Sequence, residues 1–143
     1  MMNSKLIFLV LVLVHSNLKS QNDVFGKWQT VDENSGKVTS IVEIFEKNEK
    51  LYGQIVKVIP AAGEEEDPLC KECTDFRKDK KINGMLIVSG LTFKKDVWSG
   101  GKILDPDNGK EYDCKIWLEE GKLKVRGYIS FIYRTQTWLP FNE

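Results

Sequence analysis

Three cysteines are the residues whose type and spacing could do chemistry, and two of them form the motif Cys70-Lys71-Glu72-Cys73. A Cys-x-x-Cys pair acts as a redox nucleophile when its first cysteine begins a helix, because the helix N-terminus lowers the thiol pKa. Residues 74–78 show no helical period. A zinc site would need four ligands, and the chain contains only three cysteines. We therefore expect a structural disulfide between Cys70 and Cys73 rather than a redox or metal centre.

Histidine chemistry is excluded from most of the chain. The only histidine, His15, lies within the first 20 residues, so Ser-His-Asp catalysis, Cys-His catalysis and histidine-ligated metals are absent from the remainder. Cys114 alternates with Tyr112 and Ile116 on the apolar side of a predicted strand. We expect a buried free thiol there, with a bridge to one of the loop cysteines as the alternative. No cofactor and no metal are predicted.

The acidic pattern Asp105-x-Asp107-x-Gly109-x-Glu111 is compatible at first sight with a calcium loop. The pattern does not match the spacing of an EF-hand. Lys110 stands where that loop needs its glycine, and the twelfth position is not a glutamate. Asp and Asn beside Pro and Gly are what a tight turn needs. The pattern predicts a hairpin turn.

The first 20 residues have the features of a secretory signal peptide. Lys5 supplies a positive start, and residues 6–14 form an apolar run too short to span a bilayer. A short polar stretch follows, with Gln21 as a plausible first residue of the mature chain. We predict a signal peptide over residues 1–20 and a single β-barrel domain over 21–143. The protein is then exported, to the periplasm or the extracellular space.

The net charge gives no electrostatic reason to expect a nucleic-acid partner or an anionic membrane. Two of the 21 basic residues, Lys5 and Lys19, belong to the predicted signal peptide. Residues 21–143 therefore carry 19 basic and 21 acidic residues, a formal net charge of −2. No segment after the signal peptide is apolar enough to be predicted as a membrane span.

The C-terminal part of the chain has the clearest strand pattern. Residues 110–119 alternate between apolar and polar side chains, and residues 122–138 read as two further strands. A turn at Glu120-Gly121 would place Ile116 opposite Val125 and Cys114 opposite Gly127.

Runs of β-branched and aromatic residues bounded by turn residues predict the other strands. A turn at Asn48-Glu49 would place Phe45 opposite Tyr52 and Val42 opposite Ile55. These strands are expected at residues 25–30, 38–45, 51–59, 85–88, 91–98 and 102–104, with Ser89-Gly90 and Ser99-Gly100-Gly101 as turns.

Residues 60–81 interrupt this pattern with an acidic cluster, the two loop cysteines and a basic cluster. A loop of this length in a compact domain is functional or mobile, and a solvated surface excursion pinned by its cysteines is the simplest interpretation. About eight short strands without a convincing amphipathic helix predict an all-β fold. We expect a small antiparallel up-and-down β-barrel, closed by the last strand beside the first, with one long cysteine-containing loop. A β-sandwich is the alternative.

A set of short motifs occurs in a fixed order along residues 21–143. The motifs are Gly26-x-Trp28, Leu51-Tyr52-Gly53, Cys70-x-x-Cys73, Gly84-Met85, Gly90-Leu91, Gly100-Gly101-x-Ile103-Leu104-Asp105-Pro106, Gly109-Lys110-x-Tyr112, Val125-Arg126-Gly127-Tyr128 and Arg134-Thr135-Gln136-Thr137-Trp138. This ordered set resembles an exported bacterial family known as domain of unknown function 2147. The resemblance extends over essentially all of residues 21–143, and it implies no particular activity.

A more distant resemblance connects Gly26-x-Trp28 on the first strand and Arg134 on the last with the calycins, the lipocalin and fatty-acid-binding barrels. It implies that Arg134 packs over Trp28 and seals the closed end, a cation–π contact worth roughly 0.5–2 kcal/mol. Two positions depart from the calycin pattern. Tyr133 stands where a glycine usually precedes the arginine, and Leu139-Pro140 replaces the expected polar end.

A calycin-like barrel has an interior that holds either packed side chains or one small ligand. Gly53 and Gly127 fall on predicted inward faces and would leave gaps in the wall, or mark bends at barrel corners. Aromatic side chains also fill the cores of small barrels without any ligand. The candidate lining residues are Trp28, Tyr52, Met85, Trp98, Tyr112, Arg134 and Trp138.

Three functions are compatible with these patterns. The leading hypothesis is an exported barrel that binds a small apolar or amphipathic ligand. The second is a structural or interaction module of the cell envelope with a filled barrel. The third is an enzyme without histidine, either thiol-based through Cys70 and Cys73 or of an isomerase or cyclase type, and the sequence favours a non-enzyme. The oligomeric state, the ligand and the biological process are left open.

Overall fold

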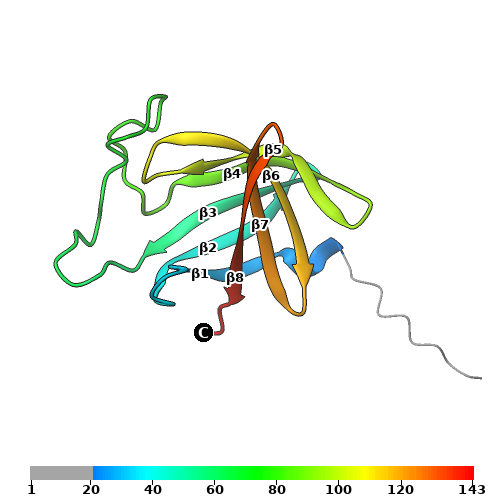
Figure 1. The fold of residues 1–143 in the computed structure, drawn as a ribbon, viewed down its shortest axis with the longest axis horizontal. Helices are drawn as coiled ribbons and strands as arrows, with labels where there is room; N and C mark the ends of the chain where they lie inside the picture. Colours follow the sequence, from blue (N-terminus) through cyan, green and yellow to red (C-terminus); the bar gives the residue numbers. More distant parts are fainter. Residues whose placement is uncertain (1–20) are drawn as a thin grey trace, which may run out of the picture.

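The computed structural model describes residues 21–143, which form eight antiparallel strands closed into a barrel (Figure 1). This part of the chain contains no α-helix, and no helix in it could cross a membrane. The predicted all-β barrel is confirmed, whereas the predicted signal peptide lies outside the described residues. The elements are η1 (Gln21–Val24), β1 (Gly26–Val31), β2 (Val38–Lys47), β3 (Lys50–Val58), β4 (Leu86–Lys94), β5 (Val97–Asp105), β6 (Lys110–Glu119), β7 (Lys122–Ile129) and β8 (Ile132–Pro140).

Every strand pairs with the next one along the chain, and β8 returns to close the barrel against β1. The closing seam is short, because β1 and β8 pair only at Trp28–Pro140 and Gln29–Leu139. By contrast, β7 and β8 pair along almost their whole length, from Leu123–Trp138 to Ile129–Ile132. The predicted return of the last strand to the first is confirmed.

Two predicted registers are confirmed residue by residue. In the β6–β7 hairpin, Ile116 faces Val125 and Cys114 faces Gly127. In the β2–β3 hairpin, Phe45 faces Tyr52 and Val42 faces Ile55. The turn between β2 and β3 is Asn48-Glu49, where both residues adopt positive φ angles, as a two-residue hairpin turn requires.

The predicted boundaries of β4 and β5 are wrong. Gly90 and Gly100 adopt positive φ angles inside strands rather than in turns between strands. The actual β4–β5 turn is Lys95-Asp96, with φ angles of 53° and 65°. A glycine within a strand marks a local irregularity as readily as a turn, and this turn is built without glycine.

One end of the barrel is sealed by η1 and by large apolar side chains. Val24 is 4% exposed, and its carbonyl accepts a hydrogen bond of 2.8 Å from the indole Nε1 of Trp28. The Phe25 ring meets the edge of the buried Trp98 ring at a centroid distance of 5.6 Å. Trp138 is also buried at this end. Burial of each such side chain contributes about 1.5–3 kcal/mol, so these contacts stabilise the closed end.

The long β3–β4 connection is largely exposed, and a few buried residues anchor it to the outer wall. An isolated bridge pairs Leu69 with Lys81, and Cys70 and Cys73 are both buried. At Gly109, in the β5–β6 turn, an added Cβ would collide with the carbonyl oxygen of Glu72. The loop is therefore an exposed excursion that its buried cysteines pin to this turn, as predicted.

Candidate functional site

The inner face of the barrel is exposed to solvent at the end opposite η1. Cross-strand partners lie on the same face of a sheet, and the register places Cys114, Gly127 and Arg134 in one row. The next row contains Val125 and Gln136. Cys114 and Val125 are buried inside the barrel, yet Arg134 and Gln136, on the same inner face, are exposed. The inner face of β8 is therefore exposed at this end, while the interior next to it is buried.

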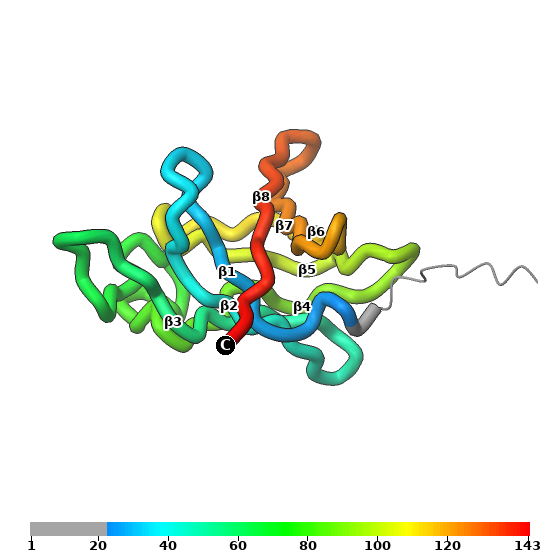
Figure 2. The backbone as a smooth tube through the Cα atoms, turned by 90° about the horizontal axis from the view of Figure 1, so that it is seen from below, coloured from blue at the N-terminus to red at the C-terminus, as the bar shows by residue number. Residues whose placement is uncertain are grey.

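The reason is that β1 and β8 separate beyond the pair Gln29–Leu139. The β1–β2 and β7–β8 hairpins end far apart (Figures 1 and 2). An ion pair crosses this separation, from Arg134 Nη2 to Glu33 Oε2 at 3.0 Å, with 71% and 47% of the two side chains exposed. Exposed pairs contribute at most about 1 kcal/mol, so a competing anion could replace Glu33.

The inner-facing residues at this end form a surface that we call the mouth, with one polar and one apolar side. On the polar side, Thr30 and Ser40 share a hydroxyl hydrogen bond of 2.6 Å, and Gln136 accepts a bond of 3.0 Å from Trp138 Nε1. The apolar side has half-buried Ile103 and Tyr112. The mouth consists of Thr30, Ser40, Ile103, Tyr112, Gly127, Arg134 and Gln136.

Space within the wall differs between the two glycines predicted to leave gaps. At Gly53 an added Cβ would lie 2.9 Å from Ile44 Cδ1 and 3.0 Å from Val88 Cβ, so neighbouring side chains already fill that position. At Gly127 the added Cβ would meet Tyr112 at 3.4 Å and Ile103 at 3.6 Å, which is ordinary van der Waals contact. The predicted gap at Gly53 is wrong, and Gly127 has room for a side chain.

The predicted position of Arg134 over Trp28 is wrong. The β1–β8 register places Pro140 opposite Trp28, and Arg134 lies six residues before Pro140 in β8, at the mouth. Trp28 instead donates its indole N–H to the Val24 carbonyl, and η1 seals the closed end. The calycin resemblance implied that an arginine covers Trp28 at the closed end. In this structure η1 covers that end, and its Val24 carbonyl oxygen makes the polar contact with Trp28.

The remaining predicted lining residues divide into three groups. Trp28, Trp98 and Trp138 are buried in the closed half of the barrel, and Met85 is 6% exposed. Tyr112 reaches the mouth, where its hydroxyl accepts a hydrogen bond of 3.0 Å from Asn108 Nδ2. Tyr52 lies on the outer face, stacked on Phe45 with ring centroids 5.9 Å apart. Its prediction as a lining residue is wrong, because alternation along β3 turns Leu51 and Gly53 inward instead.

Beneath the mouth, Cys114 is buried and free, and the predicted free thiol is confirmed. Burial raises the pKa of this thiol to about 12. A thiol with so high a pKa is almost entirely protonated at neutral pH and is a poor nucleophile. Cys114 therefore acts as a small apolar residue of the interior.

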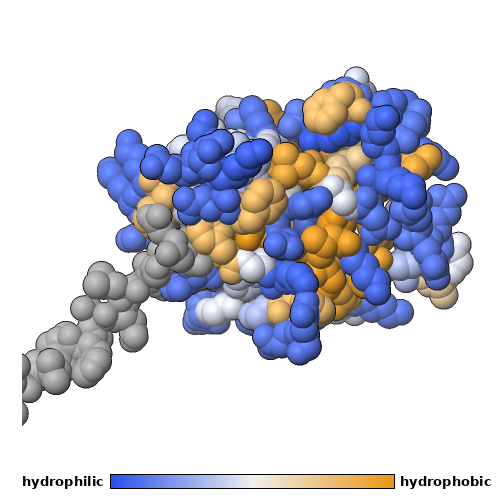
Figure 3. Space-filling model, turned by 180° about the vertical axis from the view of Figure 1, so that it is seen from behind, coloured by the Kyte–Doolittle hydropathy of each residue, from blue (hydrophilic) through white to orange (hydrophobic). Residues whose placement is uncertain are grey.

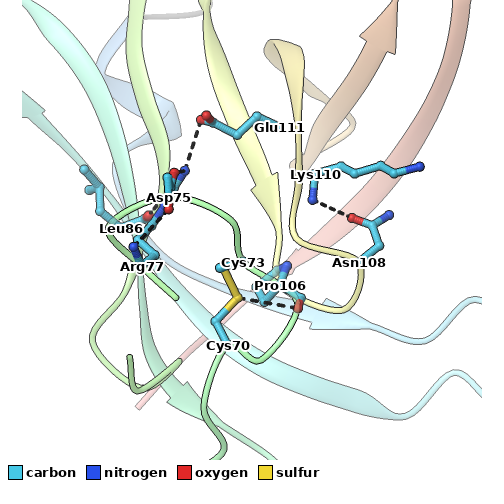
Figure 4. A network of polar contacts seen from close by, with 9 residues as sticks. All are labelled: Cys70, Cys73, Asp75, Arg77, Leu86, Pro106, Asn108, Lys110 and Glu111. Carbon is cyan, nitrogen blue, oxygen red and sulfur yellow. Dashed lines mark hydrogen bonds and ion pairs between the residues drawn. A yellow bond between two sulfur atoms is a disulfide. The ribbon is translucent and has the colours of Figure 1, made fainter. Parts of the chain in front are cut away.

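The predicted disulfide between Cys70 and Cys73 is confirmed, with a Cα–Cα distance of 5.4 Å. Figure 4 shows the bridge beside the β5–β6 turn, where Cys70 Sγ lies 3.7 Å from the carbonyl oxygen of Pro106. The two sulfur-bearing residues are at most 2% exposed. This burial fits a structural bridge and leaves little access for a redox partner.

Arg77 holds the same loop to the barrel wall (Figure 4). Its side chain is only 10% exposed, and Nη2 lies 2.6 Å from Asp75 Oδ2 and 3.3 Å from Glu111 Oε2. Nη1 also donates to the carbonyl oxygen of Leu86 at 3.4 Å. Hydrogen bonds from Arg77 lower the pKa of Asp75, and Asp75 in turn raises the pKa of Arg77. A buried cation between two carboxylates is a structural clamp between the loop, β4 and β6.

Residues 26–139 match the model of a family described as "Uncharacterized protein conserved in bacteria (DUF2147)". The chain belongs to this family. The resemblance drawn from the ordered motifs is thus confirmed. No curated protein matches the chain.

A solved structure with the same fold is protein HP1028 from the human pathogen Helicobacter pylori, described as belonging to the lipocalin family. It is 23% identical to this chain, with a TM-score of 0.69 and 82% of each chain covered. At this identity the similarity shows the fold alone. The DUF2147 chain is therefore a lipocalin-like barrel, as the calycin resemblance implied.

Several residues of the mouth were missed by sequence reasoning. Gln136 lies two residues before Trp138, so strand alternation alone could have placed it on the inner face. Thr30 lies two residues after Trp28 on β1, so the same alternation could have placed it on the inner face. No comparable signal existed for Glu33, because a turn residue has no period and its partner lies 101 positions away.

Proposed function

We propose that this DUF2147 protein is exported and binds a small amphipathic molecule at the mouth of its barrel. The apolar part of the ligand would lie against Ile103, Tyr112 and Gly127, and an anionic head would pair with Arg134. The observation that carries the proposal is the exposure of Arg134 and Gln136 on the inner face, beside half-buried apolar side chains. Residues 1–20 would direct export, and a buried disulfide fits an oxidising compartment.

One further feature supports an anionic ligand at the mouth. Glu33 can release Arg134 because the ion pair between them is exposed.

The proposal is tested with a matched pair of probes, a dansyl-labelled long-chain fatty acid and its methyl ester. Replacement Arg134→Gln should weaken binding of the acid about fivefold, the equivalent of about 1 kcal/mol, and leave binding of the ester unchanged. Replacement Glu33→Gln should tighten binding of the acid, because it frees Arg134. Equal affinity of the wild type and Arg134→Gln for the acid would contradict this role of Arg134.

A filled barrel that serves as an envelope interaction module is the second candidate. The specific observation in its favour is the tight packing away from the mouth. An added Cβ at Gly101 would collide with the carbonyl oxygen of Ser89, and the position of Gly53 is already filled. This candidate predicts that neither probe binds in a saturable manner.

A further inference from the structure

The tip of the β7–β8 hairpin carries the most exposed group of large apolar side chains among the described residues. Ile129, Phe131, Ile132 and Tyr133 are 56%, 85%, 69% and 60% exposed. The face seen in Figure 3 also carries apolar side chains, but hydrophilic ones border them closely. Outside the hairpin, the exposed large apolar side chains of the described residues are Val56 (37%), Leu69 (38%), Leu86 (39%) and Phe76 (82%).

The apolar side chains of the hairpin are ordered along its length. Phe131 lies in the turn itself, after Ser130 with a φ angle of 56°. The next pair, Ile129–Ile132, extends the inner face beyond Gly127, and the neighbouring pair Tyr128–Tyr133 lies on the outer face. The tip is thus aliphatic and aromatic, and its tyrosines follow directly behind it.

Cations lie behind the tyrosines. The guanidinium carbon of Arg126 is 4.1 Å from the centroid of the Tyr133 ring, and Lys115 Nζ is 5.5 Å from the centroid of the Tyr128 ring. Residues 122–138 contain four basic residues and no acidic one, of which Arg126 and Arg134 are the two nearer the tip. Near the tip Glu33 pairs with Arg134 and Asp113 with Lys102, and Glu119 faces Lys122 at the far end of β7.

This order of apolar, aromatic and cationic side chains is typical of protein segments that bind a bilayer surface. Apolar side chains enter the acyl boundary, aromatic side chains prefer the headgroup level, and cations bind anionic phosphates. We propose that the β7–β8 tip docks on the surface of an anionic membrane, with Phe131 and Ile132 inserted between lipid headgroups. The net charge of −2 over residues 21–143 does not report this local excess of four basic over no acidic residues in 122–138.

The shape of the tip favours a lipid surface over a protein partner. A specific protein interface buries about 800 Å² on each side, and a projecting hairpin turn presents only a few side chains. A bilayer does not need a large flat area.

Docking goes beyond the proposed ligand binding and does not depend on it. If both are correct, the inner face runs from the bilayer through Ile129 and Ile132 to Gly127 and the mouth. An amphipathic molecule could then pass between membrane and barrel without crossing open water.

Flotation with vesicles tests the proposal. The full mature chain is mixed with vesicles of phosphatidylglycerol and phosphatidylethanolamine, and separately with vesicles of phosphatidylcholine alone. We expect flotation with the anionic vesicles that weakens as salt is added. The double variant Phe131→Ser with Ile132→Ser should bind at least about tenfold less tightly. The control Phe76→Ser removes an equally exposed phenylalanine elsewhere and should bind like the wild type.

A second readout reports insertion directly. An environment-sensitive dye is attached to Phe131→Cys or, as control, to Phe76→Cys, while buried Cys114 stays unlabelled. Anionic vesicles should shift the emission of the first conjugate to the blue and leave the second unchanged.

Three outcomes would overturn the proposal: no flotation of the wild type, equal flotation of the double variant, or no dye shift at residue 131. A dimer in sedimentation that the double variant loses, without any flotation, would assign the tip to a contact between copies of the chain. Binding of the fatty-acid probe by the double variant, measured alongside, separates failure of docking from failure of the proposed ligand site.

Discussion

At the scale of single residues, Gly109 is the position at which the structure most strictly requires a glycine. Its φ angle is 72°, and a Cβ there would collide with the backbone of Glu72. We predict that Gly109→Ala lowers the free energy of unfolding by about 3 kcal/mol or more, through left-handed strain and lost docking of the loop. Urea unfolding measures this change.

Gly36→Ala is the matched control for Gly109→Ala. Gly36 has a φ angle of 70°, but an added Cβ would meet nothing within 4 Å. Only the backbone strain of about 1–2 kcal/mol applies there. Equal losses for the two variants would show that the loop does not dock tightly on the β5–β6 turn.

The Asp75–Arg77 pair predicts a dependence of stability on pH. Arg77 lowers the pKa of Asp75 below its ordinary value of 3.8, so the stabilisation is complete above that value and is lost as the pH falls through the lower pKa of the folded state. In Asp75→Asn this part of the acid destabilisation should be absent. Carboxyl titration by NMR, together with urea unfolding between neutral and acidic pH, would reveal an ordinary Asp75 pKa if the pair does not form.

Residue roles could be predicted where they depend on local pattern. The Cys70–Cys73 disulfide and the buried Cys114 followed from spacing and alternation. The role of Arg134 could not be predicted in this way. It depends on the register between the first and last strands, which no local pattern specifies, and on Glu33 in a distant turn.

At the scale of elements, the disulfide loop is a unit docked on the barrel. Four residues lie within the closed ring, so the bridge itself should contribute roughly 2 kcal/mol by the chain-entropy relation. We predict that Cys70→Ser with Cys73→Ser loosens the loop while the barrel stays folded. Hydrogen exchange should become faster in residues 69–82 and remain slow in β6 and β7.

Val56→Ser, an exposed substitution on β3, serves as the control for that comparison. Cooperative loss of protection over the whole barrel in the cysteine variant would contradict a separate loop unit. In that case the bridge would be part of the barrel's folding core.

Strand registers were predictable where a turn and an alternating pattern agreed, as in β2–β3 and β6–β7. The β4–β5 boundary was not, because glycines inside those strands resemble turn residues and the actual turn is Lys95-Asp96. The β7–β8 hairpin was predictable as two strands. The exposure of its tip was not, because exposure depends on how far the hairpin projects from the barrel.

At the scale of the whole molecule, the barrel has a sealed half and an open half. Aromatic side chains and η1 close one end, and the separation of β1 from β8 opens the other. The sequence pattern predicted the closed barrel but not the opening, since strand separation results from twist and packing over the whole sheet. The opening beside an apolar hairpin is the basis for both proposals.

The central claim, an amphipathic ligand in the mouth, is tested most directly by the native and denatured masses of the protein purified from an oxidising compartment. The account predicts extra mass under native conditions that disappears on denaturation. It also predicts that the extra mass is lost in Gly127→Leu, whose side chain would fill the mouth, and kept in Gly127→Ala. Extra mass retained by a folded Gly127→Leu variant would place the ligand elsewhere. A bare native mass, together with no saturable binding of the fatty-acid probe, would contradict the claim and favour the filled barrel.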